Sequence, residues 1–201
     1  MSLTHVFFDI GGVLGTNGWD REQRARTLQK FGLEEEDFEH RHHQVVSEFE
    51  TGAMSFEEYL DVTVFYTPRL FSREDFELYM LSLSEPNPYV VEVAKHVAKA
   101  GRVRLMTMNN ESAVLNAYRI ERFGLRGLFA AFLSSCWLGV RKPSRTFFER
   151  GLAIAQADPG ASVLIDDREQ NVAPAEALGM HAIRYTDPES LARRLAEYGV
   201  M

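Results

Sequence analysis

An aspartate at the end of a strand-like apolar run is the first residue of this sequence with clear chemical potential. The run His5–Phe8 leads into Asp9, and Gly11 and Gly12 follow at once. A carboxylate at the carboxyl end of a buried parallel strand lies where open α/β sheets place their active sites. The glycines allow a sharp turn and a close approach of the backbone to a ligand. A turn aspartate without chemical function would have the same local sequence. Other segments of the chain are therefore needed to distinguish a catalytic aspartate from a turn residue.

A second acidic site follows another apolar run. Asp166 and Asp167 come directly after Ser162–Ile165, and Asn171 follows four residues beyond the pair. Adjacent carboxylates repel each other unless a cation binds between them. Mg²⁺ is a hard ion that takes oxygen ligands and keeps several waters. One exposed aspartate beside a helix N-cap is the alternative. We favour the metal site, because so apolar a strand holds at least one carboxylate near the interior.

Two more residues could contact an anion. Thr107 ends the strand-like run Val103–Met106, and its hydroxyl, together with backbone N–H groups at a helix start, suits an anionic oxygen. A capping threonine is the alternative. Lys142 lies in an Arg-Lys-Pro segment and could place a cation beside a phosphate or a charged nucleophile. A solvated basic pair before a helix is the alternative there.

An alternation of helix and strand patterns after Pro88 predicts the elements that position these residues. The expected strands are residues 3–9, 103–108, 129–134, 162–165 and 180–185. The expected helices are residues 90–100, 112–123, 144–155, 173–178 and a last one that begins at Pro188, capped by Asp187. Strands that alternate with helices indicate an α/β fold with a doubly wound parallel sheet.

The first strand is separated from the others by a block with helical patterns only. Helices are expected from about residue 20 to 50, with a break near Gly32, and over residues 55–66 and 72–83, where Ser55 and Ser72 are predicted N-caps. We expect residues 16–84 to form an inserted α-helical cap over the carboxyl ends of the strands. Residues 1–15 and 85–201 then form the α/β core. The aromatic residues of the block predict a core of its own.

Composition narrows the possible partners. The chain has 201 residues, enough for one core and a small accessory domain. A net charge of −7 without a basic stripe argues against nucleic acid. We expect a cytoplasmic protein without membrane association, since no apolar run could span a bilayer and no signal-peptide pattern precedes the first strand. The single Cys136 excludes a disulfide framework, and its apolar neighbours favour an inert thiol over a nucleophile.

The order of these sites resembles the four motifs of the haloacid dehalogenase-like (HAD) hydrolase superfamily. The matching segments are Phe8–Leu14, Met106–Asn109, Gly139–Pro143 and Leu164–Asp167 with Asn171. The resemblance covers the whole chain, including the helical cap after the first motif. It extends to bacterial phosphatases of the glucose-1-phosphate phosphatase type and to the N-terminal phosphatase domain of soluble epoxide hydrolase. It implies a Rossmann-like core and a Mg²⁺-dependent phosphatase, with a small phosphorylated metabolite as partner and a monomeric or homodimeric state.

The resemblance also implies a role for each residue. Asp9 would attack phosphorus and form an aspartyl-phosphate, while Thr107 and Lys142 hold the transferring group. The Mg²⁺ ligands would come from Asp9, the main-chain carbonyl of Gly11 and Asp167, with Asp166 nearby and Asn171 orienting a ligand or water. Phosphate oxygens would be bound around Gly11, Gly12, Thr107, Met108, Asn109 and Lys142. A sugar phosphate is the first candidate substrate.

Gly11 departs from the superfamily pattern. Most of its phosphatases carry a second aspartate at this position as general acid and base, which contributes about 10²–10⁴-fold in rate. Another group, for example on the cap, could supply the proton; water could serve for good leaving groups; or the protein could bind phosphate compounds without efficient turnover.

Met108, where the family usually has asparagine, is a smaller departure from the superfamily pattern, and Asn109 could take the part of that asparagine. His40, Arg41, His42 and His43 could meet an anionic substrate or donate the missing proton, with a solvated helix face as the alternative.

Three rival functions stay open. A dehalogenase attacks carbon with the same aspartate and also lacks the second one, but it needs no metal and leaves Asp166 and Asp167 unexplained. A phosphomutase depends strongly on the missing aspartate. A non-catalytic binding module on the same fold is the third alternative. The acidic pair favours the phosphatase.

Overall fold

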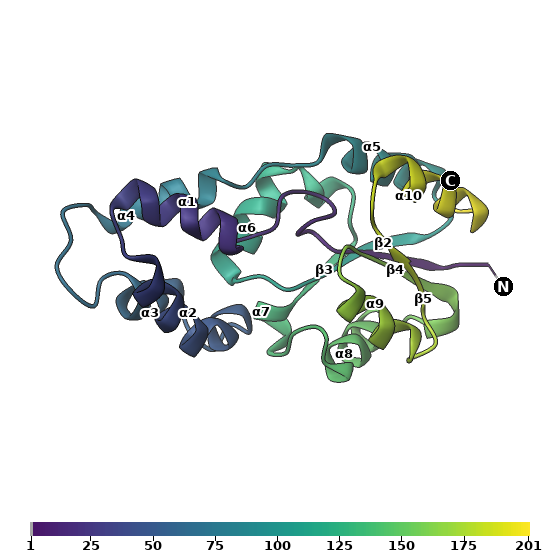
Figure 1. The fold of residues 1–201 in the computed structure, drawn as a ribbon. Helices are drawn as coiled ribbons and strands as arrows, with labels where there is room; N and C mark the ends of the chain where they lie inside the picture. The colour runs from purple at the N-terminus through teal and green to yellow at the C-terminus, as the bar shows by residue number, and fades with distance from the viewer. Residues whose placement is uncertain (1) are drawn as a thin grey trace.

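The sheet has the doubly wound parallel arrangement that the sequence predicts. The structure is a computed structural model that describes residues 2–201. Within them, five parallel strands lie in the order β3-β2-β1-β4-β5 (Figure 1). The strands are β1 His5–Phe8, β2 Arg104–Asn109, β3 Ala131–Ser134, β4 Ser162–Asp166 and β5 His181–Arg184. The α/β prediction is therefore confirmed.

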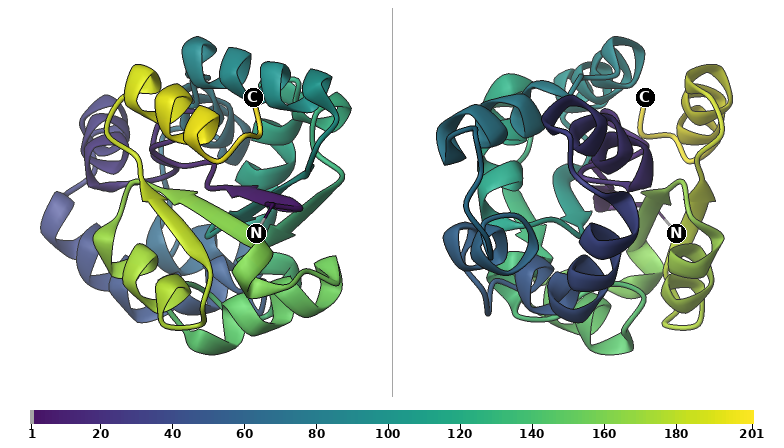
Figure 2. Two further views of the ribbon diagram at one scale, coloured as in Figure 1. Left: turned by 90° about the vertical axis from the view of Figure 1, so that its right-hand side faces the viewer. Right: turned by 60° about the vertical axis from the view of Figure 1, so that its left-hand side comes forward.

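Helices cover both faces of the sheet. Helices α5 (Pro88–Ala100), α6 (Ala113–Arg122) and α10 (Pro188–Glu197) lie on one side, and α8 (Arg145–Ala155) and α9 (Glu169–Glu176) on the other (Figures 1 and 2). Alternate residues of β1 enter the two halves of the core: Val6 and Phe8 join one cluster and Phe7 the other. A strand buried on both faces reads as a continuous apolar run, which is why β1 was predictable.

The strand order reverses between β1 and β4. From β1 the chain moves outward through β2 to β3, and it then returns to place β4 on the other side of β1. Phe8 is level with both Thr107 and Ile165, and the Asp9 amide donates to the Ile165 carbonyl at 2.8 Å. The residues that follow β1 and β4 therefore emerge side by side. Such a switch point is where open α/β sheets bind their ligands.

Four helices lie beyond the carboxyl ends of the strands (Figure 1). They are α1 Arg21–Phe31, α2 Glu35–Glu50, α3 Phe56–Thr63 and α4 Arg73–Ser82, and we call them the helical cap. Capping boxes at Ser55 with Glu58 and at Ser72 with Asp75 begin α3 and α4, as predicted. The cap has an aromatic core of its own, in which the Trp19 indole donates to the Tyr59 hydroxyl at 2.7 Å.

The two segments that join the cap to the sheet lie next to each other. The Thr16 amide donates to the Glu85 carbonyl at 2.9 Å, and the Asn87 amide donates to the Leu14 carbonyl at 2.8 Å. Gly15 and Pro86 form an isolated β-bridge between these hydrogen bonds. Both chain ends lie on the opposite side of the molecule, away from the cap (Figure 1).

Three details differ from the prediction. Strand β2 continues to Asn109, one residue beyond its predicted end. Helix α9 begins at Glu169, four residues before the predicted start, and includes Pro174. The short elements α7 (Ser135–Leu138), η1 (Leu125–Gly127) and η2 (Pro159–Ala161) were not predicted. Within residues 2–201, no helix is both long enough and apolar enough to cross a membrane.

Candidate active site

A buried lysine joins the carboxylates that follow β1 and β4. The Lys142 ammonium lies 3.0 Å from Asp9 Oδ2 and 2.6 Å from Asp166 Oδ2, and it donates to the Met108 carbonyl at 2.9 Å. Its main chain is fixed by Asn110: the Lys142 amide donates to Asn110 Oδ1 at 2.8 Å, and Asn110 Nδ2 donates back to the Lys142 carbonyl at 2.9 Å. Lys142 is thus a buried cation rather than half of a solvated basic pair.

Asp166 is held in place from several sides. Asn171 Nδ2 donates to both of its carboxylate oxygens, at 3.0 and 3.1 Å, and the Arg168 amide donates to Oδ1 at 2.9 Å. Asn171 lies in the first turn of α9, so the early start of that helix brings it to the site. Asn171 therefore lies beside the carboxylate cluster, and its direct contact there is Asp166.

Lys142 forms ion pairs with Asp9 and Asp166, and the Asp167 carboxylate lies close to both of these groups. The pKa values of the three carboxyl groups differ accordingly. Burial raises the pKa of Asp9 to about 7, against the attraction of Lys142 and with the help of the neighbouring carboxylates. Burial also opposes ionisation of Asp166, but Lys142 holds the pKa of Asp166 below its ordinary value. Burial and Asp166 raise the pKa of Asp167. The ammonium therefore compensates Asp166 and leaves Asp9 and Asp167 in need of a further cation.

The donor atoms fit a divalent cation. One carboxylate oxygen from each of Asp9, Asp166 and Asp167 lies within 4.8 Å of the other two. Asp167 Oδ1 and Asn171 Oδ1 are buried without a hydrogen-bond partner among the described residues. A buried oxygen without a partner is costly unless a cation or an ordered water satisfies it. An all-oxygen set of this kind matches the ligand preference of Mg²⁺.

The Asp167 carboxylate occupies the space that a side chain at position 12 would fill, so glycine is required there. The φ of Gly12 is +74°, and an added Cβ would lie 2.4 Å from Asp167 Oδ2. The Gly12 amide donates to the Gly15 carbonyl at 2.9 Å, so it is used in the turn rather than left free for a phosphate. Gly12 therefore has a different place from the one predicted: it packs against a candidate metal ligand.

We predict that Gly12→Ala weakens Mg²⁺ binding at least about 10-fold, because the added methyl group displaces the Asp167 carboxylate. Calorimetric titration with Mg²⁺ measures the affinity. Gly101→Ala is the matched control: Gly101 has a similar φ of +65° but nothing within 4 Å of an added Cβ. Both substitutions place alanine at a positive φ, so both introduce backbone strain, and equal Mg²⁺ affinities would contradict the prediction.

Thr107 does not reach the carboxylate cluster. It lies inside β2, level with Phe8, and its fully buried hydroxyl donates to Asn109 Oδ1 at 3.3 Å. Side chains alternate along a strand, so Thr107 shares the face of Leu105, whereas Asp9 shares the face of Phe7. The predicted contact of Thr107 with the transferring group thus has no support in the geometry.

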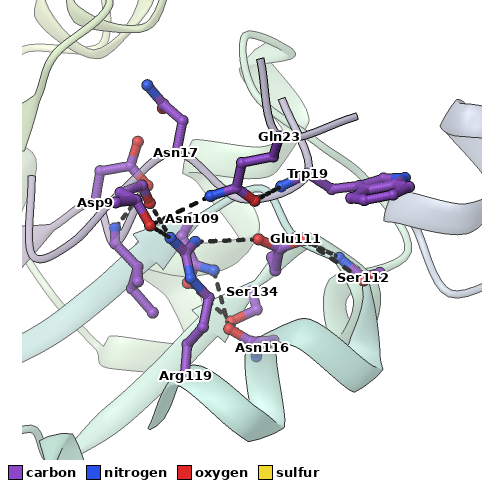
Figure 3. A network of polar contacts seen from close by, with 12 residues as sticks. Asp9, Asn17, Trp19, Gln23, Asn109, Glu111, Ser112, Asn116, Arg119 and Ser134 are labelled. Carbon is purple, nitrogen blue, oxygen red and sulfur yellow. Dashed lines mark hydrogen bonds and ion pairs between the residues drawn. The ribbon is translucent and has the colours of Figure 1, made fainter. Parts of the chain in front are cut away.

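Asn109, at the end of β2, also uses its side chain internally. Asn109 donates to Asn116, Asn116 donates to Ser134, and the Ser134 hydroxyl donates back to Asn109, with distances of 2.9–3.0 Å (Figure 3). The ring fixes the end of β2 against β3 and α6. Met108 contributes its carbonyl to Lys142, while its side chain lies in the core.

A second buried ion pair lies behind Gly11. Arg119 donates to Glu111 at 3.2 Å (Figure 3). It also donates to the Thr16 carbonyl. An added Cβ on Gly11 would lie 3.8 Å from the Arg119 guanidinium, and one on Gly18 would overlap Glu111. Burial raises the pKa of Glu111 to about 7 although Arg119 attracts its charge. No local sequence pattern predicts this pair.

A polar cavity of about 80 Å³ opens beside Asp9. Of the predicted site residues, it is lined by Asp9, Gly11, Lys142 and Asn171. The cap side contributes Asn17, Gly18 and Glu50, which were not predicted as site residues from the sequence. The sheet side adds Asn110, Arg141, Arg168 and Gln170. The cavity therefore lies between the strand ends and the cap.

The histidines of α2 lie elsewhere. His42 is buried in the cap core with its Nδ1 2.8 Å from the Tyr59 hydroxyl, and burial lowers the pKa of His42 to about 3. The side chains of His43 and His40 form hydrogen bonds with Glu39 and Gln44 of their own helix. None of the three histidines lines the cavity, so they do not supply the missing proton there.

Burial raises the pKa of the Cys136 thiol to about 12, as expected for an inert thiol.

The sequence matches the family model of haloacid dehalogenase-like hydrolases over residues 3–179. The chain therefore belongs to the haloacid dehalogenase-like hydrolase family, as the motif order predicted. A comparison with curated proteins gives no match.

Solved structures with the same fold come from several bacteria. An HAD family enzyme from Bacteroides thetaiotaomicron, in complex with magnesium and inorganic phosphate, is 20% identical, with a TM-score of 0.79 over 92% of this chain and 95% of that one. A predicted HAD-like hydrolase from Porphyromonas gingivalis is 22% identical, with a TM-score of 0.77 over 98% of both chains. The L-2-haloacid dehalogenase from Xanthobacter autotrophicus is 17% identical, with a TM-score of 0.63 over 97% of this chain and 83% of that one.

Proposed function

We propose that this hydrolase is a Mg²⁺-dependent phosphatase that acts on a small phosphate monoester through an aspartyl-phosphate on Asp9. The carboxylate cluster carries the proposal. One carboxylate oxygen from each of Asp9, Asp166 and Asp167 lies within 4.8 Å of the other two, and the Lys142 ammonium pairs with Asp9 and Asp166. One Asp167 oxygen is buried without a hydrogen-bond partner among the described residues. Such a site is short of positive charge, and a divalent cation together with an anionic substrate would complete it.

The roles follow from the contacts. Asp9 is the nucleophile because its carboxylate lines the cavity at the switch point of the sheet. Lys142 orients Asp9 and offsets the charge of the phosphoryl group. Mg²⁺ would be held by Asp9, the Gly11 carbonyl and Asp167, with Asp166 nearby, and it would reduce the repulsion between the anionic nucleophile and the anionic phosphate. Asn171 fixes Asp166, and its free Oδ1 suits a metal-bound water.

The helical cap would select the substrate. We assign residues 16–84 to the cap and residues 1–15 and 85–201 to the core, because the chain passes between them at two adjacent points. The small polar cavity suits a phosphoryl group with a small polar leaving group. A sugar phosphate remains the first candidate, and the Bacteroides relative that binds magnesium and phosphate supports the phosphate chemistry.

A haloacid dehalogenase is the second candidate, since dehalogenases share the fold and Gly11 removes the second aspartate. A dehalogenase would attack carbon with Asp9 and needs no metal. The buried Asp167 oxygen would then have neither a cation nor a hydrogen-bond partner among the described residues.

The test is a substrate panel with and without Mg²⁺. Phosphate release is measured from sugar phosphates, nucleotides and an activated aryl phosphate, and halide release is measured from 2-haloacids. We expect phosphate release that requires Mg²⁺ and stops with a chelator. Halide release that is independent of Mg²⁺ would instead establish the dehalogenase, and ligand binding without turnover of any compound would indicate a binding module.

A further inference from the structure

Glu50 is the one carboxylic acid besides Asp9 among the residues that line the active-site cavity. It is the last residue of α2, at the edge of the cap that faces the strand ends. Asp166 and Asp167 do not line the cavity, and both belong to the carboxylate cluster. Glu50 is therefore the acid that the cap presents to whatever occupies the space beside Asp9.

The position of Glu50 is fixed by contacts with the core. Its carboxylate lies 2.8 Å from the Arg141 guanidinium, and its carbonyl accepts a hydrogen bond from Ser135 at 2.6 Å. Gly52, two residues later, packs so closely on Cys136 that an added Cβ would lie 2.2 Å from the Cys136 carbonyl oxygen. These contacts dock the end of α2 on α7. The Glu50 side chain stays 28% exposed, so it can exchange a proton with water.

The charges around Glu50 suit an acid that gives and regains a proton. Burial raises the pKa of Glu50 above its ordinary value, although several cations attract its negative form. Those cations are Arg141 and Lys142 before α8, Arg168 before α9 and Arg24 on α1, while Glu111 before α6 acts in the opposite sense. A general acid works best when its pKa lies near the working pH.

The position of the missing aspartate also calls for a donor from elsewhere. Gly11 has no positive φ, and the atoms nearest to an added Cβ are 3.6–3.8 Å away, so neither the backbone nor the space requires glycine there. The carboxylic acid of the family pattern is simply absent at this position. The Arg119 guanidinium, 3.8 Å from an added Cβ on Gly11, keeps its charge in proteins and cannot serve as a proton donor.

We propose that Glu50 is the general acid of this enzyme and donates a proton to the leaving-group oxygen. The inference rests on the phosphatase function proposed above. In the first step an Asp9 oxygen bonds to phosphorus, the bond from phosphorus to the leaving oxygen breaks, and that oxygen takes the Glu50 proton, which releases the alcohol. In the second step water bonds to phosphorus, its proton passes to the Glu50 carboxylate, and the Asp9–phosphorus bond breaks, which releases phosphate. The sum is ester plus water giving alcohol plus phosphate.

A purely structural role for Glu50 predicts a different pattern. If its ion pair with Arg141 only holds the cap in place, its loss would affect all esters alike. A general acid matters for poor leaving groups, such as the alkoxide of an alkyl phosphate, and matters little for the stable phenolate of an activated aryl phosphate. The dependence of the rate on the leaving group therefore separates the two roles.

The experiment compares Glu50→Gln with Arg141→Gln, using p-nitrophenyl phosphate and the alkyl phosphate that the wild type hydrolyses fastest. For Glu50→Gln we expect kcat/KM on the alkyl ester to fall about 10²–10⁴-fold and kcat/KM on the aryl ester to change less than about 10-fold. The basic limb of the pH profile for the alkyl ester should disappear as well. Arg141→Gln breaks the same ion pair but keeps the acid, so it should affect both esters similarly.

Equal losses on both esters in Glu50→Gln would overturn the inference and leave the phosphatase intact. A wild type that hydrolyses the aryl ester but no alkyl phosphate would overturn it too, because such an enzyme uses no general acid. A wild type that releases phosphate from neither ester would instead overturn the proposed function, and the inference with it.

Discussion

Replacing Asp9 with asparagine should reduce phosphate release at least about 10³-fold, because the amide cannot form the aspartyl-phosphate. The loss should be the same for alkyl and aryl esters, since both need the nucleophile. Phosphate release in Mg²⁺ is the measurement. Asp158→Asn is the matched control: Asp158 caps η2 at the amino end of β4, away from the cavity, so this variant should keep its activity.

Folding of Asp9→Asn can be checked by its stability. Burial raises the pKa of Asp9 from 3.8 to about 7, so between these pH values the folded protein holds a proton that the unfolded chain loses. The aspartate therefore destabilises the metal-free protein as the pH rises through this window. In a chelator, we expect the stability of the variant relative to the wild type to increase as the pH rises from 3.8 to about 7. A folded variant with more than a tenth of the wild-type activity would contradict the role of Asp9.

Replacing Lys142 with methionine should cost about 3–5 kcal/mol of unfolding free energy at neutral pH, because it leaves Asp9 and Asp166 buried without their cation. Burial alone would lower the pKa of Lys142, but these carboxylates raise it, so the ammonium stays charged. The cost should shrink as the pH falls, since the carboxylates then become protonated. Urea denaturation in a chelator at two pH values measures both effects.

Lys95→Met is the matched control for this variant. The Lys95 ammonium lies 2.6 Å from Glu92, the same distance that separates Lys142 from Asp166, but both partners are exposed on α5. A surface pair of this kind contributes little, so Lys95→Met should be nearly as stable as the wild type. We also expect Mg²⁺ to raise the Tm of Lys142→Met more than that of the wild type, because the competing ammonium is gone. Similar losses in the two lysine variants would contradict this account.

The parts of the site that could be predicted follow apolar strands. β1 and β4 are buried on both faces, so Asp9 and the pair Asp166 and Asp167 stand out against an unbroken apolar run. The alternation of helices and strands predicts parallel strands whose carboxyl ends share one edge of the sheet, whereas the order of the strands was not predicted. Ser55 and Ser72 were equally readable, because a capping box is a local pattern.

The parts that could not be predicted depend on contacts between distant segments. Thr107 was interpreted as a strand end because Asn109 and Asn110 follow shortly after it, but Asn116 and Ser134 form hydrogen bonds with the buried Asn109, and β2 continues to that residue. The Arg119–Glu111 pair and Glu50 lie in helical or loop patterns that resemble any solvated surface. Helix α9 was expected to begin at Ala173, yet it begins earlier, and Asn171 in its first turn donates hydrogen bonds to Asp166.

The hydrogen bonds between Thr16 and Glu85 and between Asn87 and Leu14 have an evolutionary consequence. Because the chain enters and leaves the cap through neighbouring points, the segment between them is a cassette whose ends nearly meet. A cassette of this kind can be lengthened, shortened or exchanged without shifting the strand that carries the nucleophile. The catalytic residues of the core and the substrate-selecting residues of the cap can then evolve independently, so that one scaffold can act on unrelated metabolites.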